Sequence, residues 1–381
     1  MRIRRALFPI LLLSGLAGGC SKSSKAEPGA TESAVASTSG AASASGEPLT
    51  IDSVGSLGGL SAASAASAVA PPVLFEREDL PDLDFLGATL MEQRKALLHR
   101  MVFLGVIDER QAELMAVIMN RSKMTGQGNP EVTTHPMTRA ECFDRRHKAK
   151  VRDAVEPKCG APYMVPIWDP AKGGKETARV CIDRYEFPGL PCEYPLTWVT
   201  AAAANDLCKV MGKRLCDAHE WEGACAGAVL PVESEYAFGS ERQVMKGVHD
   251  SKREIRWAYG LKKDHSKCGT DSTKSKDCVA SGFKTCGSNT YPAGSFPECV
   301  SPFGVYDQHG NAAEHMLLPM RKEQVGQQKG IGLAEMKGSW FIFKKYEAHT
   351  DDCRWRSVPW HADEGLAHSN YHLGFRCCKD L

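Results

Sequence analysis

The residues of this chain whose chemistry is most informative are its fifteen cysteines. Cys20 stands alone near the start, and the other fourteen lie between Cys142 and Cys378. A protein kept in a reducing compartment would carry so many thiols at risk of oxidation, whereas an exported chain can pair them. The gaps between them are irregular and mostly long, without the repeated pairs that bind zinc. The cysteines therefore predict disulfides.

The first twenty residues predict export. Basic Arg2, Arg4 and Arg5 precede an apolar run, and small residues lead to Cys20. This order is typical of a secretory signal, and the apolar run is too short to cross a bilayer core of about 30 Å as a helix. The small residues before Cys20 resemble the lipobox of bacterial lipoproteins, which implies lipidation of Cys20, with an ordinary signal peptide as the alternative. The residue after Cys20 is Ser21, whereas bacterial lipoproteins that are retained in the inner membrane carry an aspartate there. We therefore expect a cell-envelope location, with the outer membrane favoured.

Residues 21–72 are dominated by Ser, Ala and Gly. Such a segment cannot bury enough apolar surface to offset the entropy lost on ordering, so we expect a disordered tether between the membrane anchor and the folded part. The formal net charge of the chain is +1. This balance of charges gives no strong positive field of the kind that attracts nucleic acid, so we do not expect nucleic acid as a partner.

A helical hairpin is predicted over residues 77–125. Asp108 is a plausible N-cap for a helix over Glu109–Asn120, with Leu114, Val117 and Ile118 expected on one apolar face. We interpret the hairpin as a packing element or spacer, and a partner-binding hairpin is the alternative.

The part that follows mixes strand and helix patterns. Met164–Ile167 and Arg179–Phe187 read as strands, and Val199–Met211 reads as a helix. Asp217 and Glu220 form the pattern of a capping box that opens another helix.

Five motifs in this part share their order with a known family. Together they resemble the formylglycine-generating enzyme, or sulfatase-modifying factor, over residues 160–381. The motifs are Cys181–Phe187 with Tyr194–Val199, Gly212–Leu215 with Glu220–Glu222, Gly304–Glu314, Lys337–Trp340 and Leu373–Cys377. The resemblance implies an irregular α+β fold related to C-type lectins, with little regular secondary structure.

The family's catalytic residues are the feature in which this chain departs from the pattern. Formylglycine-generating enzymes hold copper(I) with two cysteines shortly after the Gly-Ser motif, because copper(I) prefers soft thiolates. Here Gly338–Tyr346 contains no cysteine, and Cys353 beside Arg354 has no second cysteine within ten residues. Cys353 and Arg354 are therefore weak catalytic candidates, and copper is not expected.

A second enzymatic relative is the non-haem iron class, which needs three histidines that converge on the metal. His361, His368 and His372 are the densest histidine cluster of the chain. A four-residue spacing places two ligands on one face only in a helix, and the neighbouring Ser369–Asn370 indicates a loop. We interpret these histidines as surface residues.

The resemblance also implies a calcium site in the loop around Gly310. Its ligands would be the side chains of Asp307 and Glu314 and the carbonyl oxygens of Gly310 and Ala312. Calcium takes six to eight hard oxygen ligands from flexible loops. A hydrogen-bonded turn without metal is the alternative.

The family positions imply further that Cys208 pairs with Cys377. A weaker expectation is a bridge between Cys286 and Cys299. Cys225 also falls at a family cysteine, but the position of its usual partner is not a cysteine here.

These observations lead to one functional expectation and one alternative. We expect an envelope-anchored protein that acts in binding or envelope assembly, and we favour a non-catalytic role. Its expected partner is an envelope protein, a peptide or a glycan. The alternative is a sulfatase-modifying-type oxidase, or a non-haem metal enzyme, with a rearranged active site.

Overall fold

The computed structural model describes residues 85–279, 282–357, 362–363 and 366–381. The predicted signal sequence, Cys20, the tether and His361 lie outside these ranges. Within the described part no helix is both long enough and apolar enough to pass through a membrane. The helices are α1 Leu90–Phe103, α2 Glu109–Asn120, α3 Arg139–Lys148, α4 Ala201–Val210, α5 Ala218–Ala226, α6 Val232–Glu235 and α7 Arg242–Lys252, with 3₁₀ turns η3 Lys175–Thr177, η4 His265–Lys267 and η5 Lys322–Gln327. The strands are β1 Met164–Ile167, β2 Val180–Asp183, β3 Arg214–Leu215, β4 Ala313–Leu318, β5 Leu333–Lys337, β6 Ala362–Asp363, β7 Leu373–Phe375 and β8 Cys377–Asp380.

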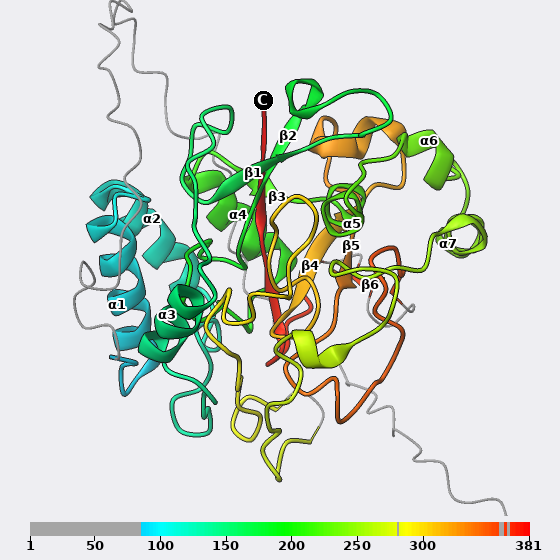
Figure 1. The fold of residues 1–381 in the computed structure, drawn as a ribbon. Coiled ribbons are helices and arrows are strands. Elements are labelled where there is room, and N and C mark those ends of the chain that lie inside the picture. The colour runs from blue at the N-terminus through cyan, green and yellow to red at the C-terminus, as the bar shows by residue number, and fades with distance from the viewer. Residues whose placement is uncertain (1–84, 280–281, 358–361, 364–365) are drawn as a thin grey trace, which may run out of the picture. The chain divides into compact units, whose positions relative to one another are not determined.

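Two four-stranded sheets form the centre of the domain. The first has the order β1-β2-β8-β3 with antiparallel neighbours, and the second has the order β6-β5-β4-β7, in which β4 and β7 are parallel. In Figure 1 the helices α1, α2 and α3 lie on one side of these strands, and α6 and α7 lie on the other. The predicted α+β class is confirmed, and long loops connect short elements throughout.

The predicted second helix of the hairpin has the expected bounds but a different buried face. Asp108 caps α2 through a capping box with Gln111. Leu114 and Val117, which we expected on the packed face, are 49% and 58% exposed. The buried face instead comprises Met115, Ile118 and Met119. The prediction of the face was wrong because the flexible methionines, at helical spacing with Ile118, fill the contact.

The hairpin packs on the rest of the domain through apolar and charged contacts. Its buried side chains belong to the same hydrophobic cluster as Leu207 of α4. Arg100 of α1 and Arg139 of α3 both donate to the carboxylate of buried Glu193, at 2.7 and 2.5 Å. Burial alone would raise the pKa of Glu193, but the two guanidinium groups lower it to about 2. These contacts support the packing interpretation of the hairpin.

Local capping signals explain two further helices. The sequence analysis did not predict α3, although Thr138 and Glu141 form a capping box at its start. The predicted box of Asp217 and Glu220 opens α5, and Gly227 ends that helix in the left-handed region with φ +79°.

Seven disulfides among the described residues pair all fourteen cysteines from Cys142 to Cys378. The bridge between Cys208 and Cys377, implied by the family resemblance, is present. The bridges are Cys142–Cys192, Cys159–Cys181, Cys208–Cys377, Cys216–Cys378, Cys225–Cys353, Cys268–Cys299 and Cys278–Cys286.

The weaker expectation of a Cys286–Cys299 bridge is wrong. Cys286 is bonded to Cys278, eight residues away, and Cys299 is bonded to Cys268. Gly269 forms a parallel β-bridge with Gly310. This pairing places the neighbouring residue Cys268 close to the loop that follows Cys299. The partner of Cys286 is thus the nearer cysteine in the sequence, whereas Cys299 pairs with a cysteine 31 positions away.

Candidate functional site

The sulfur of Cys353, the weak catalytic candidate, is bonded to Cys225 in the last turn of α5. The two residues are 128 positions apart in the sequence, and both side chains are fully buried. This partner of Cys225 could not be predicted from the sequence, because nothing in the local sequence marks so distant a contact. A bridged sulfur is not a thiolate, so Cys353 is unavailable as a copper ligand in this structure.

A histidine and an aspartate lie beside this disulfide. The Nε2 atom of His309 lies 3.3 Å from Sγ of Cys225 and 3.8 Å from Sγ of Cys353. Nε2 also accepts the backbone N–H of Ala258 at 3.0 Å, so it is the unprotonated nitrogen of the ring. On the other side of the ring, Nδ1 lies 3.7 Å from the carboxylate of Asp351.

Asp351 is held as a carboxylate by several donors. It accepts hydrogen bonds from the hydroxyl of Ser339 and the indole N–H of Trp257, both at 2.9 Å. Burial alone would raise its pKa, but the neighbouring rings of His265 and His309 hold the pKa well below its usual range. Ser339 belongs to the predicted Lys337–Trp340 motif, so the family motif and Cys353 meet at one place in the fold.

Cys225, His309 and Cys353 have the residue types of a site for a soft metal, with ligand atoms within 4.8 Å of one another. The disulfide removes both negative charges from this set, because soft cations bind thiolates. The copper(I) expected for the family therefore does not fit the residues as they stand.

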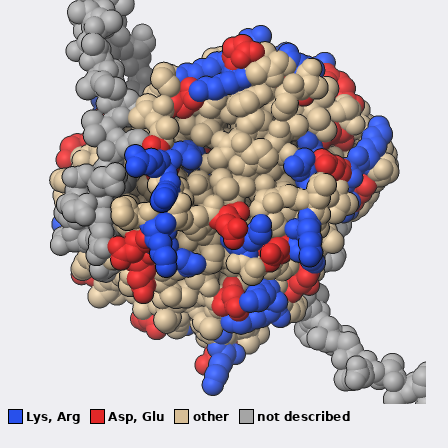
Figure 2. All heavy atoms as spheres, in the orientation of Figure 1, with Lys and Arg blue, Asp and Glu red and all other residues tan. Residues whose placement is uncertain are grey.

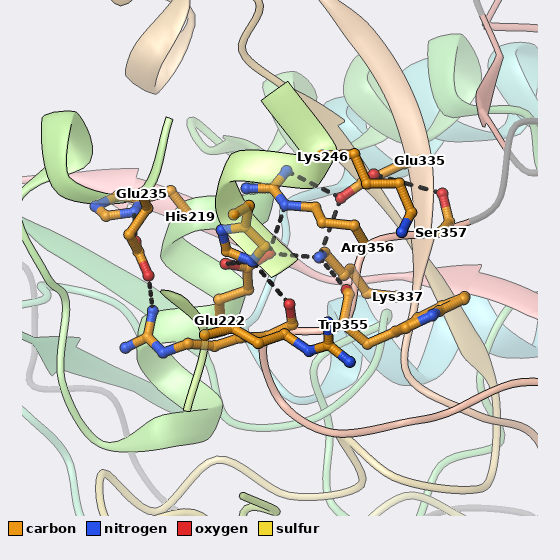
Figure 3. Close-up of polar contacts among 12 residues, drawn as sticks. His219, Glu222, Glu235, Lys246, Glu335, Lys337, Trp355, Arg356 and Ser357 are labelled. Carbon is orange, nitrogen blue, oxygen red and sulfur yellow. Dashed lines mark hydrogen bonds and ion pairs between the residues drawn. The ribbon is translucent and has the colours of Figure 1, made fainter. Parts of the chain in front are cut away.

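Arg354, the second candidate, is buried, and both terminal nitrogens of its guanidinium group make structural contacts. Its guanidinium group forms an ion pair with Glu235 and donates to the carbonyl of Ala228 at 2.9 Å. The other carboxylate oxygen of Glu235 contacts Nδ1 of His219 at 2.8 Å. Figure 3 shows His219 and Glu235 side by side. The geometry gives Arg354 no access to a substrate.

A second buried network surrounds Glu222, one turn before Cys225 in α5. Lys337 donates to Glu222 at 2.5 Å and to the carbonyl of Trp355 at 2.6 Å, and it lies 3.0 Å from Glu335. Arg356 reaches both Glu222 and Glu335 at 3.2 Å. Figure 3 shows these side chains pointing toward one another.

The charges of this network are balanced within the protein. Burial alone would raise the pKa of Glu222, but Arg356 and Lys337 lower it to about 2. Glu222, Glu235 and His249 are close enough together to hold a metal ion. Protein cations already occupy both carboxylates, so we interpret the network as the charged core that anchors α5 to β5.

The predicted calcium loop closes as a tight turn in the structure. Gly310 has φ +77°, and a Cβ atom there would meet the backbone of Gly269 at 2.8 Å. Asp307 itself lies in the left-handed region with φ +58°, which is uncommon for a residue with a side chain. The loop thus positions its carboxylates by backbone constraint.

The two predicted carboxylate ligands have different surroundings. Glu314 is bound by Arg376 through both oxygens, at 2.5 and 2.6 Å, and it accepts the indole N–H of Trp221. Asp307 accepts the backbone N–H of Gly294 with Oδ2, while its buried Oδ1 has no hydrogen-bond partner. In this geometry Asp307 can ligate a cation, whereas Glu314 is committed to Arg376.

A third carboxylate, Glu186, was not identified from the sequence. It accepts hydrogen bonds from the backbone of Ala312 and the side chain of Asn311. Burial, together with the charges of Asp307 and Glu314, raises its pKa well above the usual range. Burial also raises the pKa of Asp307 to about 7. Three buried carboxyl groups therefore surround one guanidinium, that of Arg376.

The histidines proposed for iron do not form a described site. His368 and His372 lie on a segment without helix, as expected. The interpretation as surface residues is wrong for His372, which is buried and stacks on Trp340 at a centroid distance of 4.8 Å. Among the described residues, none of the groups with metal-binding geometry contains either histidine.

Comparisons with known proteins agree with the motifs. The family model of the sulfatase-modifying factor enzyme 1-like domain matches residues 133–381. Among solved structures, PvdO from Pseudomonas aeruginosa is 17% identical, covering 53% of this chain and 80% of its own with a TM-score of 0.28. The structure of CarF is 14% identical, covering 57% of this chain and 98% of its own with a TM-score of 0.31. A comparison with curated protein sequences gave no match. The chain belongs to the family of sulfatase-modifying factor enzyme 1-like proteins.

Proposed function

We propose that this protein is an envelope-anchored lipoprotein that uses a sulfatase-modifying-factor-like domain for binding or envelope assembly, without the copper oxidase chemistry. The observation that carries the proposal is the Cys225–Cys353 bridge. It engages Cys353, the first cysteine that follows the Gly338-Ser339 motif in the sequence, and the other cysteines from Cys142 to Cys378 are bridged as well.

The lipoprotein part of the proposal rests on the basic, apolar and small residues that lead to Cys20, together with the disulfide content. Disulfides of this number persist in oxidising compartments outside the cytosol. The Ser/Ala/Gly segment over residues 21–72 would then hold the domain away from the membrane. An envelope protein, a peptide or a glycan is the proposed class of partner.

We also propose calcium as a ligand of the Asp307–Glu314 loop, on the strength of the unpartnered Oδ1 atom of Asp307. Three buried carboxyl groups around one guanidinium leave negative charge that a divalent cation would neutralise. The carbonyl oxygens of Gly310 and Ala312 would complete the set. Binding through Glu314 would require this carboxylate to share or leave Arg376.

Copper(I) titration of the purified full-length protein tests the catalytic part. We expect no stoichiometric copper(I) binding against a chelating competitor, and no oxygen uptake with a cysteine-containing peptide. One equivalent of copper(I) with oxygen turnover, both lost in Cys353→Ser, would overturn the proposal. Cys286→Ser is the matched control, because it breaks a bridge at a distant place and leaves one free thiol.

A further inference from the structure

A pocket of about 580 Å³ opens between the first sheet, the start of α5 and the start of α6. This volume lies within the range of pockets that hold small organic molecules. The pocket is separate from the Cys225–Cys353 disulfide, which does not line it. Figure 2 draws the face of Figure 1 that carries β1, β2, α5 and α6, and few charged side chains interrupt its upper middle part.

Part of the pocket wall is apolar. Ile167 from β1 and Val180 from β2 line one side, and Val229 and Val232 line another, next to the start of α6. The backbone N–H of Val229 donates to the carbonyl of Trp168, which fixes the two sides relative to each other. An occupant with an apolar body would bury surface against these side chains.

The acidic side chains of the wall already have cationic partners in the protein. Arg214 is bonded to both oxygens of Glu220. Asp380 contacts the same guanidinium at 2.6 Å. The two remaining acids pair with lysines, as Asp169–Lys172 and Glu233–Lys322. These pairings leave little acceptor capacity in the wall for a cationic ligand.

Two cationic side chains of the wall retain unused donors. His219 is 3% exposed and lines the pocket, and its Nδ1 is bonded to Glu235, whereas no described residue forms a hydrogen bond with its Nε2. Glu235 and Asp217 favour the protonated ring and raise the pKa of His219 against the opposing effect of burial. Arg179 is exposed directly before β2, and no described residue forms an ion pair with its guanidinium. The wall therefore has two sets of donors for a ligand, the Nε2–H of His219 and the guanidinium N–H groups of Arg179.

We infer that this pocket binds an amphipathic organic anion, with its carboxylate at His219 and Arg179 and its apolar body against Ile167, Val180 and Val232. Charge-assisted hydrogen bonds from an imidazolium and a guanidinium are the strongest that a carboxylate can receive from side chains. The inference rests on the proposed binding function and gives it a ligand class.

Isothermal titration of the full-length protein with octanoate tests the inference. We expect octanoate to bind, and octyltrimethylammonium, which has the same apolar body with a cationic head, not to bind. His219→Gln and Arg179→Gln should each weaken octanoate binding about 10-fold or more, because each removes a charge-assisted hydrogen bond. Arg121→Gln is the matched control, since this guanidinium is exposed and does not line the pocket.

Two results would overturn the inference. One is no octanoate binding at 10 mM, a concentration chosen to reveal even weak sites of roughly millimolar affinity. The other is octanoate binding that is unchanged in Arg179→Gln, a variant that alters an exposed side chain and leaves the core intact. Copper(I) turnover would refute the proposed function independently of either result.

The pH dependence of octanoate affinity gives a second readout. The groups that face His219 are Glu235 from α6, Asp217 before α5, Glu222 within α5 and the ring of Tyr236. Because these acids raise the pKa of His219, octanoate affinity should be high at pH 6 and fall as the ring deprotonates at alkaline pH. The His219→Gln variant should show no such fall, and a fall of equal size in that variant would contradict the role of His219.

Discussion

Replacement of Asp307 by Asn should change how the stability of the protein depends on pH. Burial raises the pKa of Asp307 from 3.8 to about 7, so the folded state holds this proton more tightly than the unfolded state does. The free energy of unfolding therefore falls as pH rises through this window, because ionisation of the carboxyl in the fold is unfavourable. Between pH 5 and pH 8 this one group should cost the wild type about 2.5 kcal/mol.

Urea unfolding at pH 5 and pH 8, with the disulfides intact, measures this effect. Asp307→Asn keeps an oxygen that can accept the N–H of Gly294 but cannot ionise. Relative to the wild type, the variant should gain about 2.5 kcal/mol between pH 5 and pH 8, measured without calcium. Exposed Asp277→Asn serves as the control and should track the wild type. Parallel pH profiles for the wild type and Asp307→Asn would refute the reasoning.

Three further predictions follow from the same contacts. Lys337→Met should destabilise the fold by about 3–5 kcal/mol, because it leaves Glu222 and Glu335 buried with less positive charge; denaturant unfolding measures this loss. If the loop binds calcium with a Kd of about 0.1–1 mM, 10 mM calcium at pH 8 should stabilise the wild type by about 1.4–2.7 kcal/mol, and Asp307→Asn by much less, in thermal unfolding. Thr138→Ala should cost about 1 kcal/mol by removing the cap of α3, measured in the same way.

A specific result would contradict each of these predictions. A loss below 1 kcal/mol in Lys337→Met would mean that Arg356 alone balances the network. Equal stabilisation by magnesium, or by calcium in Asp307→Asn, would exclude a calcium site that depends on Asp307. An unchanged unfolding midpoint in Thr138→Ala would show that tertiary contacts, rather than the cap, hold α3.

Elements defined by local signals could be predicted from the sequence. The bounds of α2 and β1 and the capping box at Asp217 agree with the structure, because caps and periodicity act within a few residues. The cap at Thr138 was an equally local signal, and α3 could have been predicted from it. Ser339, which belongs to one of the family motifs, and Cys353 lie in the same part of the fold.

Features set by tertiary contacts could not be predicted in this way. The Cys225–Cys353 bridge joins residues 128 positions apart, and the sequence contains no spacing rule for such a pair. The binding of Glu314 by Arg376 likewise depends on the parallel pairing of β4 with β7, the strand that ends directly before Arg376. The pocket at His219 could not be predicted either, because it is formed by the relative placement of two helices and a sheet.

Disulfide mapping of the natively purified protein tests whether the sulfur of Cys353 is bonded to Cys225. After alkylation without reductant, mass spectrometry should find a peptide pair linked through Cys225 and Cys353, with neither residue alkylated. A protein in which Cys353 is alkylated, with Cys225 free or bonded elsewhere, would contradict the account and restore Cys353 as a candidate thiolate ligand.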